Sequence, residues 1–306
     1  MRRVLCLLIA VLMCAAGARA EVVDDLYRAT VPVRDQGANA LAEAARLALA
    51  RVLVKVSGSE QVLGNPEVAG SMPSARSRMQ QYSYMAATDA DDGLQVRVEF
   101  DADFVTDLVF RAGEPLWTAN RPAVLAWAVV EDESGQRFVT PDSDPDVVQA
   151  LRDAFEQRGV PLQLPPHDLA DAAVLRPAAV GQLSTPALLT ASERYALEHV
   201  VGVRLVRAVN GECQGDWAYL NGDERTGRRL RAENVQACFH QGVALVAQEM
   251  AARYAVLPSS TRLGSVALTV TGVNNYADYA RLVSWLEKLE LVHGVRVRGL
   301  AGNRLE

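Results

Sequence analysis

The first twenty residues decide which part of this chain folds and in which compartment it does so. Arg2 and Arg3 form a short basic region, residues 4–16 are an apolar run, and Ala18-Arg19-Ala20 follows. A basic start, a short apolar run and a small-x-small ending are the features that signal peptidase recognises. The sequence therefore predicts a cleavable signal peptide, with cleavage after Ala20 and export to the periplasm.

Two other interpretations of the same segment stay open. A membrane anchor needs about 20 apolar residues, and this run is shorter than that. A lipoprotein would be acylated on Cys14, but its signal has a small residue before the cysteine, where this chain has Met13. Both features favour cleavage over anchoring.

Removal of the signal peptide makes the chain more acidic. It takes away three arginines and no acidic residue, so the formal net charge changes from −6 to −9. A chain with no excess of cations cannot neutralise phosphates, which argues against a nucleic-acid partner. No second apolar run of membrane-spanning length follows, so we expect no transmembrane segment in the mature chain.

Two of the four cysteines leave with the signal peptide. The mature chain keeps Cys213 and Cys238, an even pair in an oxidising compartment, which predicts one disulfide. Two inert thiols are the main alternative. A metal site would need more soft ligands nearby, and only His240 is close in sequence. An exported catalytic thiol would tend to be oxidised.

The mature chain is too long for a single small core, and its patterns predict a mixed α+β and α/β architecture. We expect two small mixed domains and a C-terminal β-α-β piece. After the signal peptide, residues 1–20, the expected parts are an α+β domain at 21–118, an α/β domain at 119–260 and the β-α-β piece at 261–306.

The first domain alternates strands and helices. Apolar periodicity predicts strands at 26–33, 81–85 and 94–100 and helices at 37–56 and 103–111. A further helix begins at Asn65-Pro66, because asparagine caps helices and proline fits their first turn. An acidic turn, 89–93, joins the last two strands.

The second domain opens with a strand that is apolar throughout. Residues 123–130 have no alternation, which is typical of a strand buried on both faces. Asp144 and Pro145 mark the start of a helix and Gly159 its end. The remaining expected elements are strands at 160–164 and 200–209, helices at 190–197 and 241–257, and a hairpin of 217–220 with 228–231.

The last segment reads as half of a ferredoxin-like unit. We expect a strand at 266–270, a helix at 279–289 and a strand at 295–297. A short or truncated C-terminus, or a partner that completes the unit, explains the missing half.

Motifs for cofactors and metals are weak. Asp142 to Asp146 has acidic residues at calcium-loop spacing, but Val147 stands where the loop needs glycine. The histidines lack zinc spacing, and the glycines form no nucleotide-binding fingerprint. We therefore expect no cofactor, no metal and no assembled catalytic group.

Three residues stand out as weak binding candidates. His167 precedes Asp168 and forms either half of an acid–base pair or a helix start, which is the more common arrangement. Trp117 and Trp217 lie at the edges of expected elements, where an indole ring can line a saccharide or peptide groove.

Several ordered motifs resemble an exported Gram-negative family catalogued as domain of unknown function 2066. The motifs are Val31-Pro32-Val33, Val52 to Gly58, Gln80 to Tyr84, Val96 to Asp101, Leu116-Trp117 and Asn120-Arg121-Pro122. The resemblance implies no activity, since the family has no established catalytic residues. Residues 121–258 are also similar in element order to the N-terminal domain of the translocation protein TolB, which implies a role in holding protein partners.

The leading hypothesis is a non-enzymatic periplasmic protein that binds or helps to assemble an envelope protein. The alternative is a periplasmic hydrolase acting on peptidoglycan or saccharide, based on His167-Asp168 and the two tryptophans. A third possibility is carriage of a small ligand between the domains.

Overall fold

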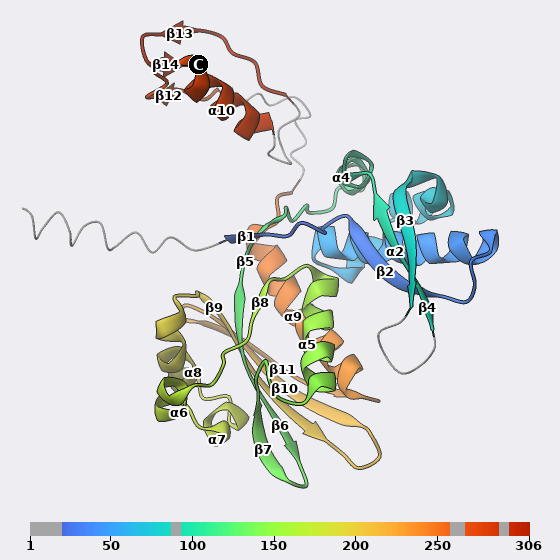
Figure 1. Cartoon of the computed structure of the whole chain (residues 1–306), viewed down its shortest axis with the longest axis vertical. Helices are drawn as coiled ribbons and strands as arrows, with labels where there is room; N and C mark the ends of the chain where they lie inside the picture. The colour runs from blue at the N-terminus through green and yellow to red at the C-terminus, as the bar shows by residue number, and fades with distance from the viewer. Residues whose placement is uncertain (1–19, 87–92, 258–266, 288–293) are drawn as a thin grey trace, which may run out of the picture. The chain divides into compact units, whose positions relative to one another are not determined.

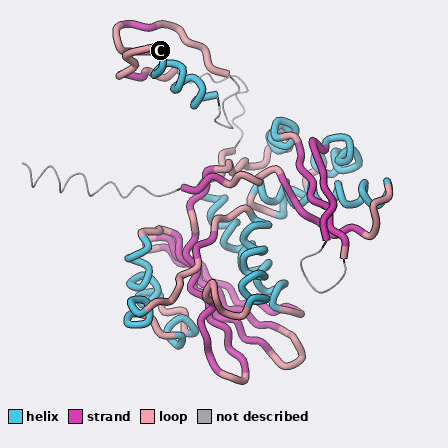
Figure 2. The backbone as a smooth tube through the Cα atoms, viewed as in Figure 1, coloured by secondary structure: helices cyan, strands magenta, loops and turns pink. Residues whose placement is uncertain are grey.

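The structure is a computed structural model that describes residues 20–86, 93–257, 267–287 and 294–306 (Figures 1 and 2). The mixed helix and strand class predicted from the sequence is confirmed. The chain divides into two compact units, Met1–Leu257 and Pro258–Glu306. Residues 1–19 of the expected signal peptide and 89–92 of the expected acidic turn lie outside the described residues.

The N-terminal part of the first unit is a three-stranded antiparallel sheet covered by helices. The strand order is β2 (Arg28–Val33), β4 (Leu94–Phe100), β3 (Met79–Ala86). The long helix α2 (Ala38–Ser57) packs against β2 and β4. The remaining elements are η1 (Glu60–Gly64), α3 (Pro66–Ser71), η2 (Met72–Arg78) and α4 (Ala102–Arg111).

Local sequence signals explain where these helices begin and end. The Asn65 side chain accepts a hydrogen bond from the Glu67 main-chain N–H, and Asp101 caps α4 in the same way. Helix α2 ends at Gly58, which adopts the left-handed conformation with φ 76°. The face of α2 that meets the sheet carries small and branched residues, which are fully buried: Ala45, Ala48, Leu49, Val52 and Val56.

A six-stranded sheet forms the second part of the first unit. Its order is β11 (Glu224–Ala232), β10 (Cys213–Asn221), β9 (His199–Arg207), β6 (Val124–Asp132), β7 (Gly135–Val139), and β8 (Leu162–Gln163) pairs with the start of β6. Strand β6 runs parallel to β8 and β9, and the other pairs are antiparallel.

Helices cover both faces of this sheet, as Figure 1 shows. Val124, Ala126 and Ala128 of β6 face the core beneath α5 (Pro145–Arg158) and α9 (Val235–Tyr254). The alternate residues, Leu125, Trp127 and Val129, face a second core. The helices on that side are α6 (Leu169–Val174), α7 (Pro177–Gly181) and α8 (Thr185–Ser192). The apolar run of β6 is therefore buried on both faces, as its pattern predicted.

Two of the predicted helices have different bounds in the structure for identifiable reasons. Helix α9 begins at Val235 instead of 241, because the Asn234 side chain caps it by accepting a hydrogen bond from Ala237 N. The helix expected at 190–197 is instead α8 followed by η3 (Glu193–Tyr195), which stops at Ala196 with φ 52°. The short α7 and β7 carry too few apolar repeats to be predicted.

Arg121 joins the two parts of the first unit. It lies in β5 (Asn120–Pro122), which pairs with β1 (Ala20–Val22), and its side chain is buried. The guanidinium donates to five main-chain carbonyls: Lys55 O at 2.9 Å, Trp117 O at 2.7 Å, Thr118 O at 2.9 Å, Arg158 O at 3.1 Å and Gly159 O at 2.9 Å. Lys55 and Arg158 lie at the C-terminal ends of α2 and α5, where the helix dipole favours a cation.

The second unit is a helix with a small antiparallel sheet. Its elements are β12 (Val270–Thr271), α10 (Tyr276–Glu287), β13 (Leu300–Ala301) and β14 (Arg304–Leu305), with strand order β12-β14-β13. The strand predicted at 295–297 is wrong, because those residues are irregular and the hairpin of β13 and β14 supplies the strand that pairs with β12. In neither unit does a described helix combine the length and the apolarity needed to cross a bilayer.

Candidate functional site

The histidine candidate does not form an acid–base pair. The His167 ring stacks on Phe138, with centroids 3.8 Å apart. The Asp168 carboxylate instead accepts main-chain hydrogen bonds at the start of α6 and pairs with Arg194 at 2.6 Å. The hydrogen bond from Arg194 holds the pKa of Asp168 well below its usual range, so this carboxylate is a poor proton acceptor. His167-Asp168 is a helix start.

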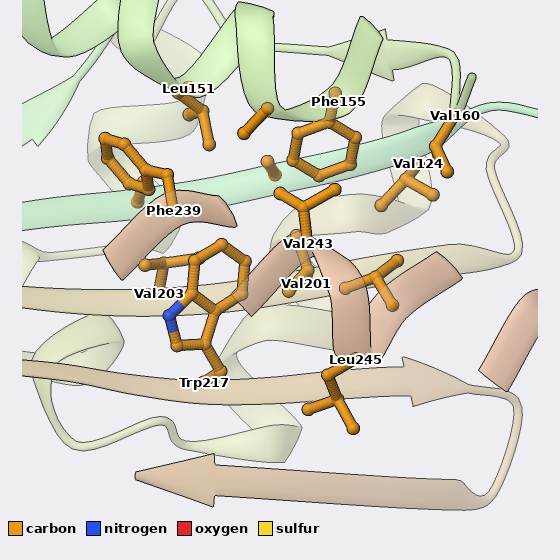
Figure 3. Packing of buried hydrophobic residues seen from close by; sticks show 14 of the residues in the cluster. Val124, Leu151, Phe155, Val160, Val201, Val203, Trp217, Phe239, Val243 and Leu245 are labelled. Atoms are coloured by element: carbon orange, nitrogen blue, oxygen red, sulfur yellow. The ribbon is translucent and has the colours of Figure 1, made fainter. Parts of the chain in front are cut away.

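Both tryptophan candidates are core residues, and the expected exposed groove is not formed. Trp117 is 0 % exposed and lies beneath the Arg121 guanidinium. Trp217 is 1 % exposed and points from β10 towards α9, where Phe239 and Val243 surround it (Figure 3). Each indole N–H is buried without a hydrogen-bond partner among the described residues. Their positions at element edges in the sequence gave no sign of this burial.

The two mature cysteines lie together in the same core. Cys213 begins β10, Cys238 lies in the first turns of α9, and both are buried free thiols. The hydrogen bond to Cys238, together with burial, raises the pKa of Cys213. The structure brings the pair together, and the disulfide between them stays a prediction.

The most distinctive surface is the edge strand of the larger sheet. Strand β11 is nine residues long and, within the described part of the chain, pairs with β10 alone. Four arginines occupy it, all exposed: Arg225, Arg228, Arg229 and Arg231. We call these four residues the arginine edge. It is strongly basic although the chain as a whole is acidic, with a net charge of −6.

The arginine edge presents charge on both sides of the strand. Arg229 lies opposite Asp216 of β10 and its Nε donates to that carboxylate at 2.6 Å. Side chains alternate along a strand, so Arg225 and Arg231 share the face of Arg229. Arg228 is on the opposite face with Leu230, which packs against the core beneath α9.

A polar cleft adjoins the second face of β11. It has a volume of about 360 Å³ and lies between the loop after α2, the end of α5, β11 and α9. Its lining residues are mostly polar: Gly58, Ser59, Glu60, Gln61, Arg158, Arg228, Leu230, His240, Gln241, Ala244 and Gln248. Two of these lining residues, Arg158 and Glu60, form an ion pair.

Positive charge dominates the cleft. Burial lowers the pKa of His240, and the nearby cations Arg158 and Arg51 lower it further, while Asp153 and Glu60 act in the opposite direction. Around neutral pH the imidazole is therefore uncharged and can either donate or accept a hydrogen bond. Two arginines and one carboxylate line this cleft, a composition suited to binding an anion.

Residues 20–118 match a family described as Domain of unknown function (DUF8605). The matched range begins with β1, contains the whole N-terminal core and stops before β5. No curated protein and no solved structure matches the chain. The resemblance to the family catalogued as domain of unknown function 2066, and the likeness of residues 121–258 to TolB, stay predictions.

Part of the basic surface was visible in the sequence. The sequence predicts that the run Arg228-Arg229-Leu230-Arg231 is one strand of a hairpin, and that hairpin is confirmed in longer form as β10 and β11. Position at the edge of the sheet depends on strand order, which local periodicity does not encode. His240 was weighed only as a metal ligand, and no group of described residues is arranged to hold a metal ion.

Proposed function

We propose that this chain is an exported periplasmic protein that binds an acidic, extended segment of an envelope protein along β11 and catalyses no reaction. The basic start, the short apolar run and the Ala18-Arg19-Ala20 ending support export and cleavage after Ala20. The observation that carries the binding proposal is the arginine edge on a long edge strand.

The physical basis is strand addition. An edge strand has one row of main-chain N–H and C=O groups that its neighbour does not use. An extended peptide can pair with that row, while pockets beside the strand select its alternate side chains. With nine residues, β11 is long enough to form several such hydrogen bonds.

The charges on β11 select the kind of segment that can pair. Two copies of β11 side by side would bring arginines close together, and like charges on neighbouring strands are destabilising. A segment with aspartate or glutamate at alternate positions would instead meet Arg225, Arg229 and Arg231 on one face. The arginine edge therefore opposes self-pairing and favours an acidic partner.

The hydrolase hypothesis loses the observations that suggested it. Asp168 is engaged in a helix cap and an ion pair with Arg194, so it does not orient His167. Trp117 and Trp217 are buried and offer no ring face to a saccharide. A protein-binding role, by contrast, is supported by the exposed arginine edge.

We also propose that Cys213 and Cys238 become joined after export. The contact between the two thiols and the oxidising compartment support this bond. Each thiol loses a hydrogen atom, and the two electrons reduce the disulfide of a thiol–disulfide oxidoreductase. Because both thiols are buried, oxidation has to precede the final packing of α9 on β10.

The test of strand addition uses two capped synthetic peptides of equal length. One alternates glutamate with valine and the other alternates lysine with valine. We expect the mature, full-length protein to bind the glutamate peptide and to slow amide hydrogen exchange within residues 224–232. Equal binding of both peptides, or protection elsewhere in the chain, contradicts the proposal.

A matched pair of variants separates a local effect from a change in net charge. The double variant R225E/R231E reverses two charges of the arginine edge, and we expect it to lose the glutamate peptide. The control, R152E/R176E, makes the same charge change at exposed residues of α5 and of the turn before α7. Equal loss in both variants would attribute binding to overall charge, and strand addition would be rejected.

A further inference from the structure

We propose that the polar cleft is a carboxylate-binding site in which Arg228 and His240 hold the ligand and Glu60 occupies Arg158 until a ligand displaces it. The ligand chemistry is a carboxylate group, carried by a small organic acid or by a peptide. This site shares Arg228 with the arginine edge, but it does not require strand addition on β11.

The cleft has the volume of a small-molecule site and a polar lining. A volume of about 360 Å³ falls within the range of small-molecule pockets. Leu230 and Ala244 contribute apolar surface, and the amide side chains of Gln61, Gln241 and Gln248 can each donate and accept hydrogen bonds. Such a lining accommodates a short carbon chain with a charged end.

Arg158 is nearly buried, whereas its ion-pair partner Glu60 is exposed and can be displaced. It is the last residue of α5, its side chain is 10 % exposed, and its main-chain carbonyl accepts a hydrogen bond from Arg121. Its partner Glu60 is 71 % exposed, in the short helix η1. Ion pairs with a highly exposed member contribute little to stability, so another carboxylate can take the place of Glu60.

Glu60 itself indicates what the cleft accepts. Its carboxylate, from the N-terminal part of the unit, accepts a hydrogen bond from the guanidinium of Arg158, and both residues line the cleft. Arginine guanidinium groups pair with carboxylates through paired, charge-assisted hydrogen bonds. The carboxylate of Glu60 thus occupies the position on Arg158 that the carboxylate of a ligand would take.

Two further groups add to the attraction of a carboxylate. Arg228 is exposed, and among the described residues none forms an ion pair or side-chain hydrogen bond with it. His240 lies within the same lining, with the cations Arg158 and Arg51 and the anions Asp153 and Glu60 around it. A bound anion would favour the charged imidazolium, so ligand binding and proton uptake by His240 should be coupled.

The experiment titrates the mature protein with glutarate, followed by isothermal calorimetry and by the NMR signals of the His240 imidazole. We expect saturable binding that tightens at least threefold from pH 7.5 to pH 6 and moves the midpoint of His240 titration upwards. Inorganic phosphate serves as the comparison anion. Equal affinity for phosphate and glutarate would overturn the assignment of a carboxylate site.

Two variants at exposed positions test Arg158 and Arg228 separately. The first changes Glu60, the ion-pair partner of Arg158, and the second changes Arg228 itself. Glu60→Gln removes the internal competitor, and we expect it to bind glutarate several-fold more tightly. Arg228→Gln removes a charged donor, and we expect a loss of about tenfold or more, because hydrogen bonds to charged groups are among the stronger ones. Arg152→Gln, on the exposed side of α5, is the matched control and should leave the affinity unchanged.

Two outcomes decide the proposal. If Glu60→Gln binds glutarate no more tightly and Arg228→Gln binds it no more weakly than the native protein, the cleft is not the site.

To identify the source of the carboxylate, a peptide with a free C-terminus is compared with its amidated form. Binding of glutarate that persists in R225E/R231E would keep this site intact even if strand addition on β11 fails.

Discussion

The guanidinium of Arg121 lies over the indole ring of Trp117, 4.0 Å from its centroid. Above that ring, the same guanidinium donates to the C-terminal carbonyls of α2 and α5. One side chain therefore neutralises the negative ends of two helices and covers an apolar ring. The main-chain dipoles at both helix ends favour the positive charge of this side chain.

Replacing Arg121 should destabilise the whole first unit. Arg121→Met removes the guanidinium N–H donors from a buried group of carbonyls. We expect the free energy of unfolding to fall by about 3 kcal/mol or more. Arg121→Lys keeps the charge but cannot reach both helix ends with one planar group, so it should recover only part of the loss. Urea denaturation measures both. Arg111→Met, at an exposed residue of α4, is the control, and an equal effect there would refute the role of Arg121.

Gly242 makes room for Trp217. A Cβ atom at Gly242 would lie 1.9 Å from the indole Cε2. Alanine normally stabilises a helix interior relative to glycine by about 1 kcal/mol, but overpacking costs about 1–3 kcal/mol. We therefore expect Gly242→Ala to lower the thermal midpoint, and Trp217→Leu to relieve part of that effect in the double variant.

Gly70 provides the comparison for this change. It lies in α3, where an added Cβ atom would meet nothing within 4 Å. Gly70→Ala should be neutral or slightly stabilising. Similar losses of stability at Gly70 and Gly242 would mean that contact with Trp217 is not the cause.

His199 should make the protein sensitive to acid. It is buried between two tyrosines, with Nδ1 2.7 Å from Tyr219 Oη and Nε2 2.8 Å from Tyr254 Oη. Burial lowers the pKa of His199; Glu198 opposes this shift and Arg253 adds to it. The unfolded chain therefore binds the proton first, with a pKa near 6.5.

Because the unfolded chain binds the proton at a higher pH than the folded protein, acid should destabilise the fold. Stability contributed by neutral His199 is present above about pH 6.5 and is lost as the pH falls towards the pKa of the folded state. Urea midpoints measured from pH 8 to pH 5 should fall for the native protein and fall less steeply for His199→Gln. Since the pKa of His240 is lowered too, His240→Gln is measured alongside. Parallel curves for the native protein and His199→Gln would contradict this explanation.

The cysteine pair should differ between compartments. Protein exported with its signal peptide should lack two hydrogen atoms relative to the reduced form, and a tryptic map should link Cys213 to Cys238. Protein made in the cytoplasm should keep both thiols. Free thiols that react with an alkylating agent in unfolded, exported protein would show that the bond does not form.

Most elements of the first unit could be predicted from local patterns. Asn65, Asp144 and Gly159 mark helix ends in the sequence and have those roles in the structure, because caps depend on neighbouring residues alone. The uniform apolar run of β6 likewise indicated burial on both faces. These predictions succeeded because each rests on contacts within a few residues.

The candidate site depended on relationships between distant residues. Trp217 is covered by α9, which comes from elsewhere in the chain, and Trp117 belongs to the same core. Arg228 and His240 meet only when β11 and α9 come together beside the end of α5. Strand order and helix packing decide these contacts, and local apolar periodicity predicts neither of them.

The family match ends at residue 118, and Arg121 lies just beyond it. Cut at that border, the segment would keep α2 but lose the donor that satisfies Lys55 O, along with the strand that pairs with β1. The border of sequence similarity is therefore not a border of folding. A recombinant N-terminal fragment should therefore extend at least through Pro122, so that β5 and Arg121 stay with the matched segment.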